Sequence, residues 1–317
     1  MERILITGGT GFLGKRLGKK LKEMGHVVIL AGRNNKQNLL ASKFSDCEAL
    51  PMDVCHIESV RDVVNQVKPD VIIHAAATKF VDLSEKQPME AVDVNVIGSQ
   101  NIARVAIDKK IKTVIGISTD KASPPVRNTY GLTKALMERM FCALDKTSDV
   151  NFLCVRYGNV AWSTGSVLPI WRKMAKQDGM FFTTGPDMIR YFFTVDEAVQ
   201  LVITALTNVE ELHGKVLSRS MKSAKMEDIL KVWSKQENIG YKKIEERPGE
   251  RDIEFLIGEL EIPFTREKLF NRIPHYIISF NEKVANPIEG IKSSGNAERL
   301  TESEILDIVN NPPMEEI

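Results

Sequence analysis

Five side chains that can move protons or hold a reacting oxygen lie close together in the chain. Thr119, Asp120 and Lys121 are adjacent, and Tyr130 and Lys134 follow shortly after them. A phenol is a weak base at neutral pH, but an ammonium one helical turn away favours its phenolate form. An adjacent carboxyl group and amine supply a further acid and a further base. These residues therefore predict a site for successive proton transfers.

The elements around these side chains are expected to bring them to one place. The apolar residues 113–117 predict a buried parallel strand, and residues 129–144 predict a helix. Tyr130 and Lys134 then share one helix face, so both can reach a common point. Thr119 and the two charged residues after it follow the strand at its carboxyl end, where open α/β sheets bind ligands. The alternative for the two charged residues is a surface ion pair.

A glycine-rich turn near the start of the chain predicts a dinucleotide cofactor. It follows an apolar strand at residues 3–7 and precedes leucines at helical spacing up to Gly25. Glycines allow the backbone to approach a pyrophosphate, which then lies at the helix N-terminus. The alternative is a purely structural turn. The predicted contacts are Gly8, Thr10, Gly11, Phe12, Leu13 and Gly14.

The loop after the second predicted strand, residues 27–31, favours NADP over NAD. Proteins that prefer NAD usually place a carboxylate there to bind the ribose 2′-hydroxyl. This loop instead carries Arg33, Asn34 and Lys36, and its basic side chains suit a 2′-phosphate. A solvated basic loop is the alternative interpretation.

Two further strand ends are expected to contact the cofactor. The third predicted strand, residues 48–54, ends in Asp53 and Val54, where an adenine ring can pass. The fourth, residues 71–77, ends in small side chains that permit close approach of a ligand. The predicted contacts at that end are Ala75, Ala76 and Ala77.

Two polar residues near these strands have a less specific pattern. His74 lies in an apolar strand, which is more typical of a packed, hydrogen-bonded core residue than of a catalytic one. Asn95 lies in a helix that opens at Pro88 and runs through Val105. We include Asn95 among the cofactor-binding residues, although a buried polar spacer and a link in a proton path both remain open.

The order of the predicted elements defines the fold class. Six alternating strand and helix units predict an α/β fold, a Rossmann-like doubly wound parallel sheet with a smaller C-terminal substrate-binding region. We expect an NADP-binding domain at residues 1–160, with a returning segment at about 191–217. Residues 161–190 and 218–317 are expected to form the substrate-binding cap and a tail. Thr301 and Glu304 predict a helix cap in that tail.

Composition excludes several classes of function. The 43 basic and 42 acidic residues nearly cancel, so the chain has almost no net positive charge to attract nucleic acid or an anionic membrane surface. No apolar run approaches the roughly 18 residues that cross a bilayer, and a strand begins without a signal peptide before it. The four cysteines lack metal-binding spacing, so no metal site is predicted. We expect a reduced, cytoplasmic protein.

The motifs together resemble a known family. The glycine turn, the Tyr130-x-x-x-Lys134 pair and Thr119 are similar to those of the extended short-chain dehydrogenase/reductases. Three further motifs resemble the soluble UDP-N-acetylglucosamine 4,6-dehydratases of polysaccharide and flagellin-sugar biosynthesis. They lie at residues 118–122, at 156–160 with 165–167, and at 247–250. The resemblance runs from residue 3 to about residue 280.

The resemblance implies a reaction and a role for each of the five side chains. Tyr130 takes the proton of a sugar C4 hydroxyl, Thr119 binds the reacting oxygen, and Lys134 holds the nicotinamide ribose of a tightly bound, recycled NADP. Asp120 is the acid and Lys121 the base that eliminate water across C5 and C6. Because an adjacent Asp and Lys normally form an ion pair, we expect burial to shift the pair towards its neutral form.

The resemblance also implies the substrate and the assembly. The substrate is a UDP-linked N-acetylhexosamine, foremost UDP-N-acetylglucosamine, and the protein is a homo-oligomer, a dimer or higher. The guanidinium groups of Arg247 and Arg251 suit a diphosphate. The other implied substrate contacts are Lys79, Asn159, Ser166, Val167, Arg190 and Glu250.

Two other functions fit parts of the pattern. A nucleotide-sugar C4 epimerase or reductase of the same fold needs the Tyr130 and Lys134 pair, but has no use for Asp120 and Lys121 as a second acid and base. A non-catalytic NADP-binding regulator gains little from an activated phenol.

Overall fold

The computed structural model describes residues 1–245 and 249–313. The first half of the chain alternates strands with helices, as predicted. It contains β1 (Arg3–Thr7), α1 (Phe12–Glu23), β2 (Val27–Gly32), α2 (Asn35–Ser45), β3 (Glu48–Pro51), α3 (Ile57–Val67), β4 (Val71–His74), α4 (Val81–Lys86), α5 (Pro88–Val92), a π-helical segment (Asp93–Ile97), α6 (Gly98–Asp108), β5 (Thr113–Ile117), a 3₁₀ turn (Asp120–Ala122), α7 (Thr129–Leu144) and β6 (Asn151–Val155).

The second half mixes short strands with helices. It contains β7 (Asn159–Val160), α8 (Val167–Asp178), β8 (Met180–Thr183), β9 (Ile189–Phe193), α9 (Val195–Thr207), α10 (Val209–Leu212), β10 (Val216–Arg219), β11 (Lys222–Lys225), α11 (Met226–Glu237), β12 (Gly240–Lys243), β13 (Phe255–Ile257), a 3₁₀ helix (Glu259–Phe264), β14 (Thr265–Phe270), β15 (Ile273–Ile278), β16 (Lys292–Ser293) and α12 (Glu302–Asn310).

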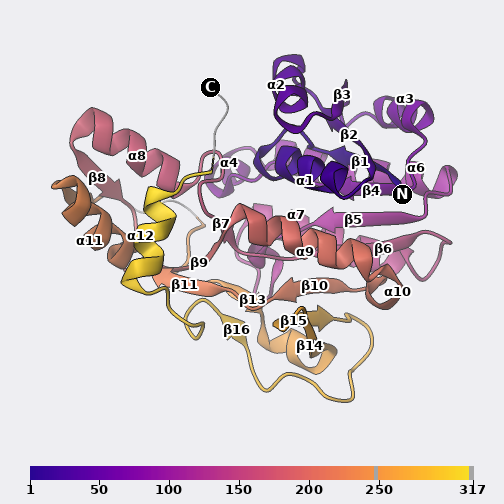
Figure 1. The fold of residues 1–317 in the computed structure, drawn as a ribbon. Coiled ribbons are helices and arrows are strands. Elements are labelled where there is room, and N and C mark those ends of the chain that lie inside the picture. Colours follow the sequence, from indigo (N-terminus) through magenta and orange to yellow (C-terminus); the bar gives the residue numbers. More distant parts are fainter. Residues whose placement is uncertain (246–248, 314–317) are drawn as a thin grey trace.

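The largest sheet of the described residues has the strand order β14-β15-β10-β6-β5-β4-β1-β2-β3. The strands from β3 to β10 are parallel, whereas β15 is antiparallel to β10, and β14 is in turn antiparallel to β15. Helices α1 and α9 pack together, and α3 packs on α6 (Figure 1). The predicted α/β fold with a doubly wound parallel sheet is therefore confirmed.

The strand order reverses between β1 and β4, and this reversal positions the site. After β1 the chain turns towards β2, and after β4 it turns the other way, towards β5, so the two connections diverge at the carboxyl ends of these strands. In open α/β sheets the crevice at such a reversal binds ligands. The glycine turn and residues 75–77 therefore meet at the carboxyl ends of the strands.

Several predicted elements end earlier than expected. Strand β3 stops at Pro51 and β4 at His74, so Asp53 and the three alanines lie in loops. The helix expected from Pro88 through Val105 is interrupted by the π-helical segment, which contains Asn95. These ends differ because apolar residues near the sheet edge pack against the core without pairing to a neighbouring strand.

A second hydrophobic cluster lies beside the sheet. Trp162, Trp171, Phe181 and Trp233 pack ring against ring among α8, β8 and α11. The predicted tail helix is confirmed as α12, with Thr301 and Glu304 forming its capping box. Strands β14 and β15, in the region assigned to the cap and tail, extend the main sheet. The division into two domains stays a prediction.

The described residues contain neither a membrane-spanning helix nor a metal-binding cluster. None of their helices combines the length and apolar character that crossing a membrane requires. Within the same residues, no group of three or more His, Cys, Asp or Glu side chains is arranged to hold a metal ion.

Candidate active site

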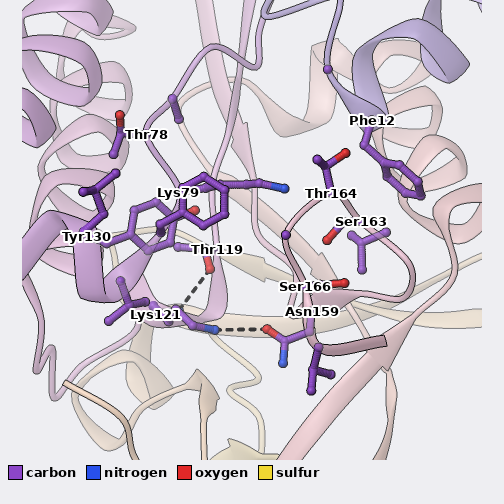
Figure 2. A pocket seen from close by; sticks show the side chains of 18 of the residues that line it. Phe12, Thr78, Lys79, Thr119, Lys121, Tyr130, Asn159, Ser163, Thr164 and Ser166 are labelled. Atoms are coloured by element: carbon purple, nitrogen blue, oxygen red, sulfur yellow. Dashed lines mark hydrogen bonds between the residues drawn. The ribbon is translucent and has the colours of Figure 1, made fainter. Parts of the chain in front are cut away.

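A cavity of about 820 Å³ lies at the carboxyl ends of the parallel strands. Its walls come from the glycine turn, the loops after β4 and β5, the start of α7, and the loop that leads into α8. Figure 2 shows Tyr130 and Lys121 on one side of this space, and Ser163, Thr164 and Ser166 on the loop that faces them. The cavity is therefore placed where the sequence predicts a site.

The glycine turn fits closely against the loop after β4. Gly8 has a φ of +65°, and a Cβ there would lie 2.6 Å from the backbone nitrogen of Ala76. A Cβ on Gly14 would lie 2.6 Å from the carbonyl oxygen of Gly8. Only glycine fits at these two positions, and α1 then begins at Phe12 without an acidic residue in its first turn. This cradle suits the pyrophosphate of a dinucleotide.

Most of the predicted cofactor contacts line the cavity, but four do not. Asn34 caps α2, with its side chain accepting a hydrogen bond from the backbone of Gln37. Lys36 is exposed on α2, and the Asp53 carboxylate accepts a hydrogen bond from the Cys55 amide. The contacts that do line the cavity are Gly8, Thr10, Gly11, Phe12, Leu13, Gly14, Arg33, Val54, Ala75, Ala76, Ala77, Tyr130 and Lys134.

Asn95 is the fourth predicted contact that lies away from the cavity wall. Its side-chain oxygen accepts from the amide of Thr78, and its amide group donates to the carbonyl of Thr78 and to the hydroxyl of Thr133. Asn95 is fully buried. It therefore ties the loop after β4 to helix α7, which agrees with a buried polar spacer.

His74 is a hydrogen-bonded core residue, as its pattern predicted. Its Nδ1 lies 2.7 Å from the Thr7 hydroxyl, and its Nε2 lies 3.0 Å from the Ser99 hydroxyl. Ser99 donates its own hydrogen to the Asn95 carbonyl, so it accepts from Nε2. The ring is therefore neutral, with its proton on Nε2. Burial lowers the pKa of His74 to about 3.

The start of α7 places Tyr130 beside Thr119. Asn128 caps this helix by accepting from the Gly131 amide. A Cβ on Gly131 would clash with the carbonyl oxygen of Lys121, so the helix packs directly on the 3₁₀ turn that follows β5. This contact brings the phenol to the end of the strand.

The protonation of Tyr130 differs from the expectation. Burial raises the pKa of the phenol to about 12, although the Lys121 ammonium and a hydrogen bond with Thr119 both act to lower it. We expected Lys134 to supply the charge. Lys134 is itself buried and donates to the Met137 sulfur at 3.4 Å, and burial lowers its pKa to about 8. The cation that lowers the pKa of Tyr130 is therefore Lys121.

Asp120 is fully buried at the end of β5. Its amide donates to the Tyr157 carbonyl, which fixes the backbone. Its Oδ1 accepts from the Thr119 hydroxyl and from Lys121 Nζ, each at 3.0 Å. Its Oδ2 has no hydrogen-bond partner among the described residues. Asp120 and Lys121 therefore form an ion pair that is buried rather than at the surface.

Lys121 is held as an ammonium, which contradicts the expected neutral pair. Its Nζ donates to Asn159 Oδ1 at 3.2 Å and lies 3.6 Å from Glu254 Oε1 (Figure 2 shows the bond to Asn159). Burial disfavours the charge, but Asp120 and Glu254 outweigh it, and the pKa of Lys121 is raised. The expected shift to a neutral amine was wrong because the attraction of Asp120, and to a smaller degree that of Glu254, outweighs the effect of burial.

Glu254 was missed from the sequence. It lines the cavity wall and is almost fully buried. It follows the Arg247 to Arg251 motif by three residues and directly precedes β13. A single glutamate before three apolar residues carried no recognisable signal.

A buried ionic network supports the loop that carries Asp120. The guanidinium of Arg156 binds Glu138 on α7 and Glu261. Glu261 also accepts from the Ser123 hydroxyl at 3.0 Å. Arg156 lies in the motif at residues 156–160, but its two partners could not be predicted, because they lie far from it in the chain.

The predicted substrate contacts divide into three groups. Arg247 lies outside the described residues. Arg251 does not line the cavity, because it is buried and donates to the carbonyl of Pro125. The contacts that line the cavity are Lys79, Asn159, Ser166, Val167, Arg190 and Glu250.

Ser166 and helix α8 form a second helix N-terminus at the cavity. Ser166 is the residue before α8, and its hydroxyl is buried without a hydrogen-bond partner among the described residues. The first turn of α8 contains no acidic side chain. Free amides and the helix dipole favour an anion at such a position.

Comparison with known proteins gives relatives over nearly the full chain. The family described as polysaccharide biosynthesis protein matches residues 4–272. The chain is 36% identical to an uncharacterised membrane protein of Methanocaldococcus jannaschii, with 97% of this chain and 95% of that protein covered. It is 31% identical to the inverting UDP-N-acetylglucosamine 4,6-dehydratase of Campylobacter jejuni, with 98% of both covered.

An epimerase and a solved structure are similar as well. The UDP-glucose 4-epimerase of Rickettsia bellii is 30% identical, with 98% of this chain and 96% of that enzyme covered. The X-ray structure of Pen from Bacillus thuringiensis matches with a TM-score of 0.89 and 27% identity, covering 98% of this chain and 97% of that one. The fold extends over nearly the whole of both chains.

Proposed function

The chain belongs to the polysaccharide biosynthesis protein family and is similar to a nucleotide-sugar dehydratase and to an epimerase, and we propose that it is an NADP-dependent nucleotide-sugar 4,6-dehydratase. The substrate is a UDP-N-acetylhexosamine, with UDP-N-acetylglucosamine as the first candidate. The observation that carries the proposal is the buried Asp120 and Lys121 pair beside Tyr130. An acid and a base next to the phenol suit an elimination.

The cofactor would lie against the glycine turn. A bound nicotinamide dinucleotide supplies hydride transfer, from C4 of the sugar and back to C6. The N-terminus of α1 would bind the pyrophosphate, Arg33 the 2′-phosphate, and Lys134 the nicotinamide ribose. Lys134 supports this role because it is buried at the cavity wall, with only a weak bond to the Met137 sulfur.

Oxidation at C4 requires a base. Tyr130 takes the proton of the C4 hydroxyl, and Thr119 donates a hydrogen bond to the reacting oxygen. The raised pKa of the phenol means that the Lys121 charge must favour the phenolate during this step, because the single hydroxyl hydrogen of Thr119 then binds the reacting oxygen. That hydrogen must turn away from Asp120 Oδ1, which accepts it in the structure.

Elimination of water follows from the C4 ketone, which acidifies the hydrogen at C5. Lys121 takes this proton, and Asp120 gives a proton to the departing C6 hydroxyl. Both residues follow the same strand, but Lys121 lines the cavity whereas Asp120 is fully buried beside it, so Asp120 must turn its carboxyl group towards C6 in this step. Because nearby carboxylates raise the pKa of Lys121, its ammonium must lose a proton before it can act as the base.

The diphosphate of the substrate would lie at the N-terminus of α8. The unpartnered Ser166 hydroxyl and the nearby α8 amides support this position. Arg190 lines the cavity and adds a positive charge. Arg251 instead holds the Pro125 carbonyl, so a role at the diphosphate requires that bond to break. We also propose that the enzyme is cytoplasmic and homo-oligomeric.

A panel of nucleotide sugars with mass spectrometry and NMR of the products tests this function. A 4,6-dehydratase forms a product that lacks one water, with a methyl group at C6. An unchanged mass with an altered C4 configuration would instead identify a C4 epimerase, a function that the Rickettsia relative favours. Tight binding of NADP without turnover of any sugar would identify a non-catalytic regulator.

A further inference from the structure

Glu254 lies next to the proposed base but has no role in the mechanism above. Its Oε1 is 3.6 Å from Lys121 Nζ and 4.0 Å from Arg190 Nε. Its side chain is 5% exposed, and it lines the cavity. Its Oε2 has no hydrogen-bond partner among the described residues. Burial of a carboxylate oxygen without a hydrogen-bond partner costs folding free energy, so the position of Glu254 requires an explanation.

The backbone holds this carboxylate in place. The Glu254 amide donates to the Ser294 hydroxyl at 2.9 Å, and the Ser294 amide donates to the Glu254 carbonyl at 2.8 Å. The Ser294 hydroxyl then donates to the carbonyl of Ile189, on β9. Rotation of the Glu254 backbone away from Lys121 would break this set of bonds. These bonds therefore fix the backbone that carries the carboxylate, while the carboxylate itself can turn at the cavity wall.

The charges around Lys121 determine how protons can be shared among Lys121, Asp120 and Glu254. One ammonium lies between two carboxylates, with Asp120 Oδ1 at 3.0 Å and Glu254 Oε1 at 3.6 Å. Two carboxylates that share one cation repel each other, so one of them can hold a proton while the other balances the ammonium. Asp120 can thus carry the proton that it needs as an acid while Lys121 stays charged.

We propose that Glu254 accepts a proton from Lys121 as Lys121 takes the proton from C5. This inference rests on the proposed dehydratase function. A proton on Lys121 Nζ moves to the Glu254 carboxylate, and the electron pair that this frees on Nζ takes the C5 proton as the C5–H bond breaks. The electron pair of the C5–H bond forms the C5–C6 double bond, the C6–O bond breaks, and the Asp120 proton leaves with the oxygen as water. Glu254 thereby acts through Lys121 and does not touch the sugar.

Asp120 cannot accept the Lys121 proton in its place. As the acid, Asp120 must hold a proton when the step begins, so its carboxyl group is not free to take another. Glu254 is the other carboxylate whose oxygen lies within 4 Å of Nζ among the described residues. Its unpartnered Oε2 can turn towards Nζ or bind a water once Oε1 is engaged.

Replacement of Glu254 by Gln tests the proposal, because Gln keeps the size and a hydrogen-bond acceptor but cannot take the proton. With UDP-N-acetylglucosamine, Glu254→Gln is expected to retain reduction of the cofactor, followed by its near-ultraviolet absorbance. Formation of the dehydrated product should fall by about 100-fold or more. Exchange of the C5 hydrogen with deuterated water, followed by NMR, should fall in parallel. Glu254→Asp should recover part of both.

Glu259→Gln is the matched control, since Glu259 is exposed five residues further on, and it should behave as the wild type. Full dehydration by Glu254→Gln would overturn the proposal. Equal losses of cofactor reduction and dehydration in both Glu254 variants would assign Glu254 a structural role and overturn it as well. A wild type that neither reduces cofactor nor loses water with any nucleotide sugar would refute the proposed function, and this inference with it.

Discussion

Arg156 holds Glu138 through two buried hydrogen bonds, 3.0 Å from Nε to Oε1 and 2.6 Å from Nη2 to Oε2. Glu138 lies on α7, the helix that carries Tyr130. The same guanidinium binds both oxygens of Glu261, which in turn binds Ser123 in the loop after Asp120. One arginine therefore joins the helix of the proposed base to the loop of the proposed acid.

Replacement of Arg156 by Met is expected to lower the free energy of unfolding by about 3–5 kcal/mol, because it leaves two buried carboxylates without their cation. Urea unfolding measures this change. Lys146→Met is the control, since Lys146 forms an exposed pair with Glu282, and it should cost about 1 kcal/mol or less. A loss below about 1 kcal/mol for Arg156→Met would contradict a bracing role.

The parallel half of the sheet could be predicted because each strand and helix carries its own periodic pattern. The strand order around β1 then follows from the glycine turn, which indicates the point where the order reverses. The positions of β14 and β15 could not be predicted. They pair by antiparallel contacts at the edge of the sheet, and the sequence of neither strand indicates which strand it pairs with.

The candidate site could be predicted where its residues are close in sequence. Thr119, Asp120, Lys121 and Tyr130 come together because one strand and one helix carry them. Glu254 could not be found this way, because its contact with Lys121 joins residues from different halves of the chain. Some side chains that were predicted to bind ligands instead make local hydrogen bonds, as Asn34 does when it caps α2.

Replacement of Asp120 by Asn should stop the elimination. Asn has nearly the same size but cannot give a proton to the C6 hydroxyl. The rate of formation of the dehydrated product should therefore fall by about 100-fold or more. NADP binding should be unchanged, because Asp120 does not line the cavity wall. Mass spectrometry of the product and a fluorescence titration of the cofactor measure the two effects. Asp187→Asn, at an exposed position, is the control.

An Asp120→Asn variant with full dehydratase activity would show that another group is the acid. A variant that loses NADP affinity and dehydration together would indicate damage to the fold of the loop instead of loss of the acid.

Replacement of Arg33 by Ala should weaken NADPH binding by about 10- to 100-fold, the range of one hydrogen bond to a charged group. Binding of NADH should change little, since NADH lacks the 2′-phosphate. Lys36→Ala is the matched control, because Arg33 lines the cavity and Lys36 does not. Calorimetry with both cofactors measures the affinities. A wild type that binds NADH as tightly as NADPH would contradict the proposed NADP preference.

The buried His74 should make the fold sensitive to acid. Its Nδ1 accepts a hydrogen from the Thr7 hydroxyl, which itself accepts from the Ala76 amide in the loop against the glycine turn. A protonated ring would need to donate from Nδ1, and the bond to Thr7 would reverse. This conflict and full burial agree with the lowered pKa of about 3.

The unfolded chain binds a proton at its ordinary histidine pKa of about 6.5, whereas folded His74 does not until about pH 3. Between these values the unfolded state holds more protons, so stability falls as the pH falls, by up to about 1.4 kcal/mol per pH unit from this group. His74→Gln should show a shallower fall over this range, measured by urea unfolding at several pH values. Substitution of the exposed His56 should leave the wild-type slope unchanged. Equal slopes in wild type and His74→Gln would contradict the prediction.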